Sequence, residues 1–269
     1  MRTKTRTNLD RVLKALFICF FILLVAICSV LILSPLLTSK SHGEIDYDFA
    51  PIYQDSYEVE IDYDAIHYQD FVKELTDKMA GKSYAITLVN LSDPVKNFSI
   101  NGDQVMVSAS TYKLFTAYTM YKTGQAPACL ADMIIYSDNN CPESWGKWNL
   151  TTSNARAIGA TSTNLMATPT LTTSNDLALF LTKLYNGALL PEVQADKLLS
   201  MMKIQVYREG IPAGIPEADV ADKVGFLDGI LNDAGIVYSP KGDFVLVILT
   251  DGYSWRSIAN TASEIYAKM

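Results

Sequence analysis

Histidine is nearly absent from this chain of 269 residues, which contains only His42 and His67. A serine–histidine–aspartate triad needs a histidine beside its nucleophile, and zinc sites are built mainly from histidine and cysteine. Neither kind of site is therefore expected, and we predict no metal and no other cofactor. Glycine-rich phosphate loops and internal repeats are also lacking. Any nucleophile in this chain must be activated by a group other than histidine.

Cysteine is scarce as well, with four residues. Cys19 and Cys28 lie in a long apolar run, which leaves Cys129 and Cys141 for the rest of the chain. A location outside the cytoplasm would permit a disulfide between these two. The sequence favours such a structural disulfide and leaves two buried thiols as the alternative.

Charged side chains are missing from residues 15–37. As a helix this apolar run would span about 35 Å, enough to cross a bilayer. The preceding residues 1–14 are basic, so the positive-inside rule leaves them in the cytoplasm. We predict a single-pass cell-membrane protein with a basic cytoplasmic tail over 1–14, a transmembrane helix over 15–37 and the bulk of the chain outside. A cleaved secretory signal is the alternative, although such signals usually have a shorter apolar region.

The remainder of the chain is acidic, and the whole carries a formal charge of −7. An acidic body argues against nucleic acid as a partner. Acidic residues are concentrated over 38–65, a segment without helical periodicity, which predicts an extended, solvated stalk. Alternating residues within it leave an added edge strand as the alternative.

Residues 66–269 are predicted to form one domain of the α+β class. Apolar periodicity indicates a helix over 65–80, then strands over 84–91 and 97–104, and a mostly helical block from Ser110 to about Met202. Three strand-like runs and a final helix follow, over 222–231, 234–239, 243–252 and 254–269. This order predicts an α/β sandwich in which helices flank an antiparallel, five-stranded sheet from both chain ends, with a helical subdomain inserted.

A serine and a lysine, Ser110 and Lys113, stand three residues apart at the predicted start of a helix. This spacing turns both side chains to the same face. Lysine paired with serine is a recognised histidine-free route to an activated nucleophile. Lys113 can take the proton of Ser110 only when it is neutral, a state that burial and a second nearby cation favour. The backbone N–H of Ser110 would also be free at a helix N-terminus to stabilise an oxyanion.

The same spacing recurs at Ser200 and Lys203, so the Ser-x-x-Lys pattern is weak evidence by itself. The order of further motifs separates the two pairs. Ser110 is followed by the S-D-N run at 137–139, and then by Lys-Val-Gly at 223–225 in a predicted strand.

In this order the three runs resemble the S-x-x-K, S-D-N and K-T-G signature of class A β-lactamases and penicillin-binding proteins, the penicillin-recognising serine hydrolases. The resemblance extends from about Ala65 to the end of the chain and implies the fold shared by serine β-lactamases and D,D-peptidases. A literal K-T-G at 122–124 comes before the S-D-N run and is interpreted as a helix end capped by glycine.

The resemblance implies a role for each motif residue. Ser110 is the nucleophile, Lys113 activates it, and Ser137 relays a proton to the leaving nitrogen. Asn139 holds Lys113 and the substrate, while Lys223 supplies positive charge for a substrate carboxylate.

Further substrate-binding residues follow from the same resemblance. Gly225 precedes the second oxyanion donor, the backbone N–H of Phe226. Arg256 on the last predicted helix is a candidate for a second cation near the substrate carboxylate, with a surface charge as the alternative.

Two departures from the family pattern bear on turnover. Val224 replaces a hydroxyl residue, which removes a hydrogen bond worth roughly 1.5 to 3 kcal/mol when the partner is charged. Class A β-lactamases also use a glutamate between the second and third motifs to activate the deacylating water. Between Glu143 and Glu192 the only carboxylate is Asp176, which is predicted to be the third residue of a capped helix. Acylation is therefore better supported than rapid turnover.

Large apolar side chains on the helix of the nucleophile predict core packing rather than substrate contact. They are Tyr112, Leu114, Phe115, Tyr118 and Met120. Trp145 and Trp148 are also predicted to be packing residues.

Three functions are compatible with these features. The first is a membrane-anchored serine hydrolase that opens a β-lactam amide through an acyl-enzyme on Ser110. The second is a penicillin-binding D-alanyl-D-alanine carboxypeptidase whose partner is the peptidoglycan stem peptide, and the third is a non-catalytic cell-wall-binding module. The absent loop glutamate favours the second function, and the likeness to class A sequences favours the first.

Overall fold

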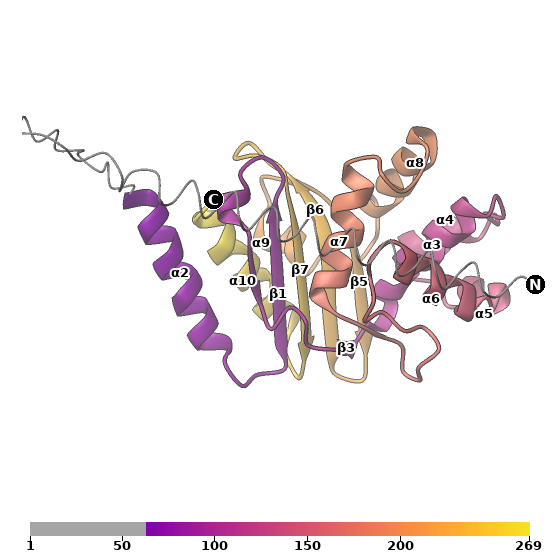
Figure 1. Ribbon diagram of the computed structural model, residues 1–269, viewed down its shortest axis with the longest axis horizontal. Coiled ribbons are helices and arrows are strands. Elements are labelled where there is room, and N and C mark those ends of the chain that lie inside the picture. The colour runs from indigo at the N-terminus through magenta and orange to yellow at the C-terminus, as the bar shows by residue number, and fades with distance from the viewer. Residues whose placement is uncertain (1–62) are drawn as a thin grey trace, which may run out of the picture. The chain divides into compact units, whose positions relative to one another are not determined.

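The computed structural model describes residues 63–269 (Figure 1). The basic tail, the transmembrane helix and nearly all of the acidic stalk, predicted from the sequence, lie outside these residues. Among the helices that the structure describes, none combines the length and the apolar character needed to span a membrane.

An antiparallel sheet of five strands forms the centre of the domain, in the order β2-β1-β7-β6-β5. The strands are β1 (Tyr84–Asn90), β2 (Phe98–Ile100), β5 (Asp219–Leu227), β6 (Ile230–Tyr238) and β7 (Phe244–Asp251). The predicted sheet built from both chain ends is therefore confirmed. β5 begins three residues earlier than predicted, because its first residues pair with the end of β6, as Asp219 does with Tyr238. The predicted strand over 222–231 is wrong at its end, because Asp228 and Gly229 form the turn between β5 and β6.

Both faces of this sheet are covered, and the sequence of β7 shows why. Successive side chains of a strand point to opposite faces. Phe244, Leu246 and Ile248 enter one buried apolar cluster, whereas Val245, Val247 and Leu249 enter the other. A strand without a polar face needs helices on both sides.

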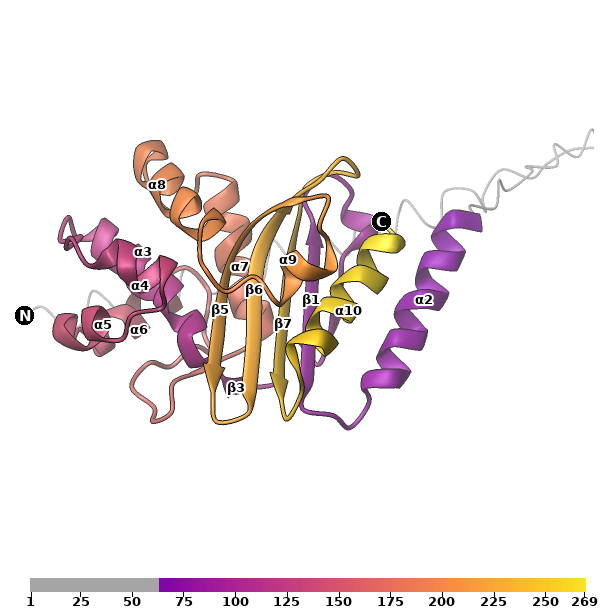
Figure 2. The same cartoon turned by 180° about the vertical axis from the view of Figure 1, so that it is seen from behind.

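Helices at the two chain ends cover one face of the sheet (Figure 2). They are α2 (Tyr63–Met79) and α10 (Trp255–Ala267), accompanied by the short α9 (Ile211–Gly214). α2 begins two residues earlier than predicted, with Asp64 in its first turn, where a carboxylate favours a helix N-terminus. On the opposite face α7 (Ser174–Tyr185) packs against the sheet.

The inserted block is mostly helical, as predicted. Besides α7, its helices are η3 (Ala109–Tyr112), α3 (Lys113–Lys122), α4 (Leu130–Ile135), α5 (Asn140–Trp145), α6 (Trp148–Ala157) and α8 (Glu192–Lys203). Leu114, Phe115, Tyr118 and Met120 of α3 are buried, which confirms their assignment to the core. The sequence did not reveal the short helix η2 (Pro94–Lys96) or the two-stranded sheet of β3 (Met106–Val107) and β4 (Leu171–Thr172).

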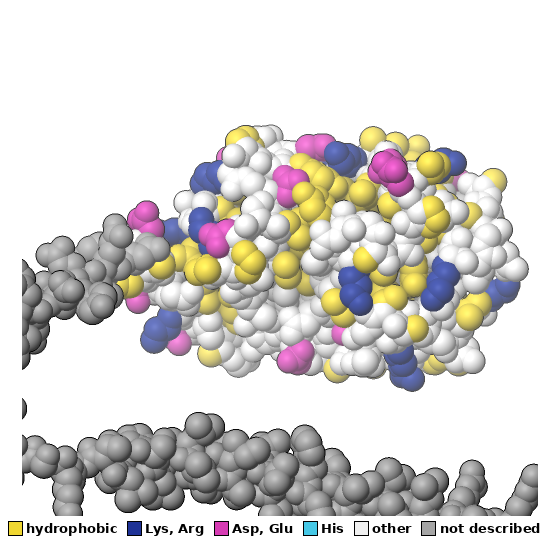
Figure 3. Space-filling model, turned by 45° about the horizontal axis from the view of Figure 1, so that its top comes forward, with side chains coloured by type: hydrophobic (Ala, Val, Ile, Leu, Met, Phe, Trp, Pro, Cys, Tyr) yellow, Lys and Arg dark blue, Asp and Glu magenta, His cyan; other side chains and the backbone are white. Residues whose placement is uncertain are grey.

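The surface of the described domain carries charges of both signs between apolar side chains (Figure 3). Lysine, arginine, aspartate and glutamate side chains are scattered over the face shown rather than gathered into one basic patch. A scattered pattern of this kind is typical of a solvated protein surface.

Candidate active site

Ser110 lies in the 3-10 turn η3, directly before α3, rather than in the first turn of an α-helix as predicted. Hydrogen bonds fix the backbone on its N-terminal side. The Ser108 N–H donates to the Thr170 carbonyl at 2.9 Å, and the Asn232 side chain donates from β6 to the Val107 carbonyl at 2.8 Å. The segment of Thr170 and strand β6 therefore both hold the chain that leads into the turn of Ser110.

Lys113 is the first residue of α3, and its ammonium group is surrounded by oxygen acceptors. Its Nζ lies 2.9 Å from Ser110 Oγ, 2.6 Å from the Ser137 carbonyl oxygen and 2.6 Å from Asn139 Oδ1. The side chain is fully buried. The structure thus brings together the first two motifs predicted from the sequence.

Burial lowers the pKa of Lys113 to about 8, although the negative charges of Asp138 and Glu143 act in the opposite direction. With that pKa about a tenth of the lysine is neutral at pH 7. A neutral amine 2.9 Å from the serine hydroxyl can accept its proton.

Ser137 connects the two buried lysines. Lys223 Nζ donates to Ser137 Oγ at 2.9 Å, and Lys113 Nζ lies 3.3 Å from the same oxygen. The backbone of Ser137 is left-handed, with φ of 58°, a conformation that is uncommon for residues other than glycine. A hydroxyl in contact with both amines can pass a proton between Lys113 and a reacting group.

Lys223 is buried in β5, and this burial, followed by the charge of Lys113, lowers its pKa to about 7. Two fully buried carboxyl groups lie near it, Asp222 on the same strand and Asp233 on β6. Burial raises the pKa of both carboxyl groups, to about 6 for Asp233. Arg208 pairs with Asp222 and also donates to the Val220 carbonyl at 3.0 Å. The sequence did not reveal this network, because it depends on the register of β5 and β6.

Gly225 allows β5 to lie against the turn of the nucleophile. A Cβ atom at this position would be 2.8 Å from the Ser108 carbonyl oxygen and 2.9 Å from the Ser110 nitrogen. Contacts of that length are tighter than atoms tolerate, so only glycine fits. β5 is an edge strand, whose outer backbone groups have no strand partner. The neighbouring Phe226 therefore lies beside the nucleophile, with 43% of its surface exposed.

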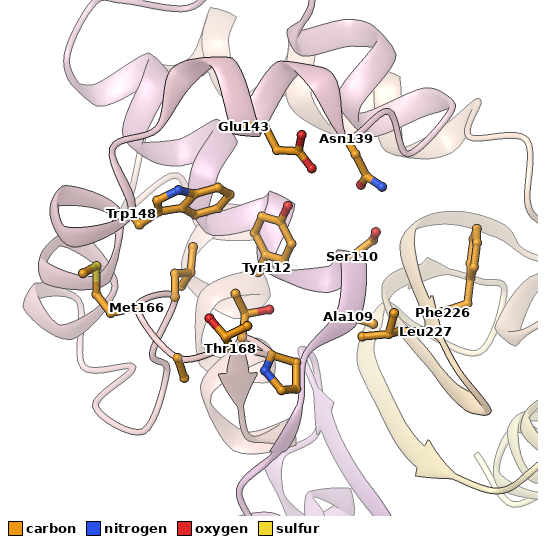
Figure 4. Close-up of a pocket in the computed structure, with 14 residues that line it drawn as sticks. Ala109, Ser110, Tyr112, Asn139, Glu143, Trp148, Met166, Thr168, Phe226 and Leu227 are labelled. Carbon is orange, nitrogen blue, oxygen red and sulfur yellow. The ribbon is translucent and has the colours of Figure 1, made fainter.

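A cavity of about 480 Å³ opens beside Ser110 (Figure 4). Asn139 and Phe226 also line it, together with residues that the sequence did not assign to the site: Tyr112, Glu143, Trp148, Leu227 and the loop 165–170. The prediction that Tyr112 belongs to the core is wrong. Tyr112 ends the 3-10 turn, so its ring reaches the cavity and packs edge-on against Trp148 at 5.6 Å between centroids.

A disulfide joins Cys129 to Cys141, as the sequence favoured. It connects the residue before α4 to the first turn of α5, so it encloses the S-D-N run. Asp138 accepts a hydrogen bond from the Cys141 N–H at 2.9 Å. The segment that supplies Ser137 and Asn139 is thereby fixed on both sides.

A model of the β-lactamase enzyme family matches residues 125–269. The chain belongs to the β-lactamase enzyme family. The match includes the S-D-N and Lys-Val-Gly runs and begins after Ser110 and Lys113. As a member of this family, the protein is a serine hydrolase that acts on β-lactams or similar amides.

Solved structures resemble this β-lactamase-family chain in fold. PBP-A has 21% sequence identity and a TM-score of 0.66, covering 75% of this chain and 95% of its own. A variant of PBP-A, solved as an acyl-enzyme complex with penicillin G, has 20% sequence identity and a TM-score of 0.65. The alignment covers 75% of this chain and 96% of the variant. The β-lactamase of Sphaerobacter thermophilus has 18% sequence identity and a TM-score of 0.63. The alignment covers 77% of this chain and 96% of that β-lactamase. No curated protein sequence matches the chain.

Some residues singled out by the sequence lie away from the cavity of this family member. Arg256 is exposed on the first turn of α10 and does not line the cavity, so its substrate-binding role stays a prediction. Val224 is buried and also absent from the cavity lining. Asp176 is the third residue of α7, capped by Thr173, and accepts a hydrogen bond from Thr163 at 2.8 Å. The structure gives Asp176 the helix-capping environment that was predicted for it.

Proposed function

We propose that this protein forms an acyl-enzyme on Ser110 when it opens its amide substrate, with Lys113 as the base. The main support for the proposal is the distance of 2.9 Å between Lys113 Nζ and Ser110 Oγ, with the Lys113 side chain fully buried. The partners of Nζ are neutral oxygens rather than a carboxylate, so no ion pair holds its proton. The site therefore supplies a neutral amine at the nucleophile.

The acylation step begins when neutral Lys113 removes the proton of Ser110. Ser110 Oγ then attacks the amide carbon, and the carbonyl oxygen becomes an oxyanion. Lys113 returns the proton through Ser137 to the amide nitrogen as the C–N bond breaks. The products of this step are an ester on Ser110 and a free amine, which in a β-lactam stays attached to the opened ring.

Backbone N–H groups of Ser110 and Phe226 are assigned to the developing oxyanion. The close approach of Gly225 to Ser110 N supports this assignment, because it brings the edge strand β5 beside the nucleophile. One such donor typically contributes about 2.7 to 4 kcal/mol to the stability of the transition state.

The substrate in this proposal carries a carboxylate near the scissile amide. Lys223 supplies the attracting charge, and Asn139, which lines the cavity, binds the amide side of the substrate. β-Lactams have this arrangement, and the structural relative captured with penicillin G supports them as substrates. The second candidate is a D-alanyl-D-alanine carboxypeptidase, favoured by the lack of a carboxylate in the loop 165–170.

We further propose that residues 15–37 anchor the domain to the outer face of a membrane, with peptidoglycan or an antibiotic within reach. The Cys129–Cys141 disulfide supports this location, since disulfides persist outside the cytoplasm.

Intact-mass spectrometry after mixing with benzylpenicillin tests the acyl-enzyme. We expect an adduct of the whole drug on wild-type protein and none on Ser110→Ala, because the variant lacks the attacking oxygen. The matched control is Ser200→Ala, which removes the serine of the second Ser-x-x-Lys pair and should leave the adduct unchanged. An adduct that survives in Ser110→Ala, or is absent from the wild type, contradicts the proposal.

A further inference from the structure

The loop on one side of the cavity carries no group that could take a proton from water by itself. Residues 165–170 read Leu-Met-Ala-Thr-Pro-Thr. An acyl-enzyme in this site would need a base elsewhere in the cavity for its hydrolysis. Among the lining residues of the described chain, Glu143 is the only carboxylate.

Glu143 lies on α5, four residues after Asn139. Residues four apart share one face of a helix, and both side chains line the cavity. Figure 4 shows the Glu143 carboxylate above the Tyr112 ring, on the same side of the cavity as Asn139 and facing Ser110 across open space. The same turn that holds Lys113 through Asn139 thus also directs a carboxylate toward the nucleophile.

The carboxylate of Glu143 has no hydrogen-bond or ion-pair partner among residues 63–269, and the residue is exposed. Its charge nevertheless reaches the reacting groups. It raises the pKa of Lys113, against the effect of burial, and it raises the pKa of Tyr112 in addition to burial. An exposed carboxylate without a protein partner is bound by water. Glu143 is therefore available to a water molecule in the cavity.

We propose that Glu143 is the base that activates water for hydrolysis of the acyl-enzyme, an inference that rests on the proposed acylation of Ser110. In this proposal the base lies on α5, beside the second motif, and not in the loop between the second and third motifs. The absence of a glutamate from that loop then does not make the adduct permanent.

Hydrolysis begins when the Glu143 carboxylate takes one proton from water, and the resulting hydroxide attacks the ester carbon. The tetrahedral intermediate collapses with cleavage of the bond to Ser110 Oγ. The proton held by Glu143 passes by way of Lys113 to that oxygen, which restores the serine hydroxyl. The product leaves as a carboxylic acid and releases its own proton to solvent.

A cation-binding role is the competing explanation for Glu143, since its carboxylate lies beside the aromatic rings of Tyr112 and Trp148. The two roles differ for a substrate without positive charge. A base is needed for any ester on Ser110, whereas a cation site does not act on benzylpenicillin. Benzylpenicillin is therefore the probe that separates them.

The test compares wild type, Glu143→Gln and Glu192→Gln by rapid-quench mass spectrometry with benzylpenicillin. Loss of the base should slow clearance of the Ser110 adduct by about 10²- to 10⁴-fold, with its formation changed less than about threefold. Glu192→Gln, which alters an exposed glutamate in the first turn of α8, should match the wild type in both steps. Glu143→Asp, with a shorter reach, should clear the adduct at an intermediate rate.

Two results would overturn the role of Glu143 and leave the acylation of Ser110 standing. One is an adduct that clears from Glu143→Gln as fast as from the wild type. The other is an adduct that never clears from the wild type. A wild-type protein that forms no adduct would instead refute the proposed function, and the role of Glu143 with it.

Discussion

Two Ser-x-x-Lys pairs occur in this chain, and the structure gives them opposite environments. Lys113 is fully buried, and oxygens of Ser110, Ser137 and Asn139 surround its Nζ. Lys203 is the last residue of α8, and its Nζ forms an ion pair with Asp219 at 2.6 Å. The spacing is identical, yet one lysine is surrounded by neutral acceptors and the other is paired with a carboxylate.

The serines differ in the same way. Ser110 opens onto a cavity large enough for a substrate, whereas Ser200 is exposed on the surface of α8. Lys203 also packs over the Tyr238 ring, 4.2 Å from its centroid, which favours the charged amine. Burial and the choice of partner, rather than spacing, turn a serine and a lysine into a nucleophile and a base.

Removing each lysine in turn should have very different effects on acylation. We expect Lys113→Ala to lower the rate of adduct formation with benzylpenicillin by about 10²- to 10⁴-fold, because general-base assistance is lost. Lys203→Ala removes an exposed ion pair, worth about 0.2 to 1 kcal/mol, and the contact with the Tyr238 ring, both away from the cavity, and should leave the rate unchanged. Stopped-flow or rapid-quench acylation rates check both. Equal effects of the two substitutions would contradict the difference between the two lysines.

The two Lys-x-Gly runs allow a second contrast. Gly225→Ala places a methyl group against Ser108 and Ser110, and such overpacking costs about 1 to 3 kcal/mol of folding free energy. Because the clash falls on the nucleophile turn, acylation should slow as well. Thermal unfolding measured beside acylation rates tests this expectation.

Gly124→Ala is the matched control. No atom lies within 4 Å of the added methyl group, but the residue has φ of 65°, which costs a non-glycine residue roughly 1 to 2 kcal/mol. Gly124→Ala should therefore lose stability and keep its acylation rate. Unchanged acylation in Gly225→Ala would show that the close approach of β5 is not needed for chemistry.

The protonation state of Lys113 should also make the acylation rate depend on pH. Burial lowers the pKa of Lys113 to about 8, so the reactive neutral amine becomes more abundant as pH rises toward that value. At saturating benzylpenicillin, acylation should increase about tenfold per pH unit between about pH 6 and 7 and level off above about 8. Lys203→Ala should follow the same profile. A rate that falls with rising pH over this interval would exclude neutral Lys113 as the base.

Much of the fold could be predicted because its elements have strong local signals. The strands that complete the sheet are apolar runs, and α7 is capped so that Asp176 is its third residue, as predicted. The order of the three motifs likewise predicted that Ser110, Lys113 and Ser137 share one site, and the structure brings both serine hydroxyls within 3.3 Å of Lys113 Nζ. These features depend on residues near one another in the chain or on a fixed order.

Other features depend on backbone geometry that residue types do not reveal. Ala109 and Ser137 have positive φ values of 43° and 58°, although neither is glycine. The 3-10 turn rotates Tyr112 into the cavity, where an α-helix was predicted to bury it. The family pattern points to the loop between two motifs for a base, so it does not indicate Glu143. The place of Glu143 in the cavity follows from the orientation of α5, which no local pattern specifies.

The strand order also determines when, during synthesis, the enzyme can fold and become active. β7 lies between β1 and β6, and Tyr84 pairs with Thr250 across most of the chain. During synthesis, β1 and β2 therefore have no sheet to join until β7 has been made, and closing so long a loop is slow. A nascent or truncated chain that stops before Phe244 contains every motif residue but lacks the strand that joins its two halves. Folding and activity must then wait for the last part of the chain to be made.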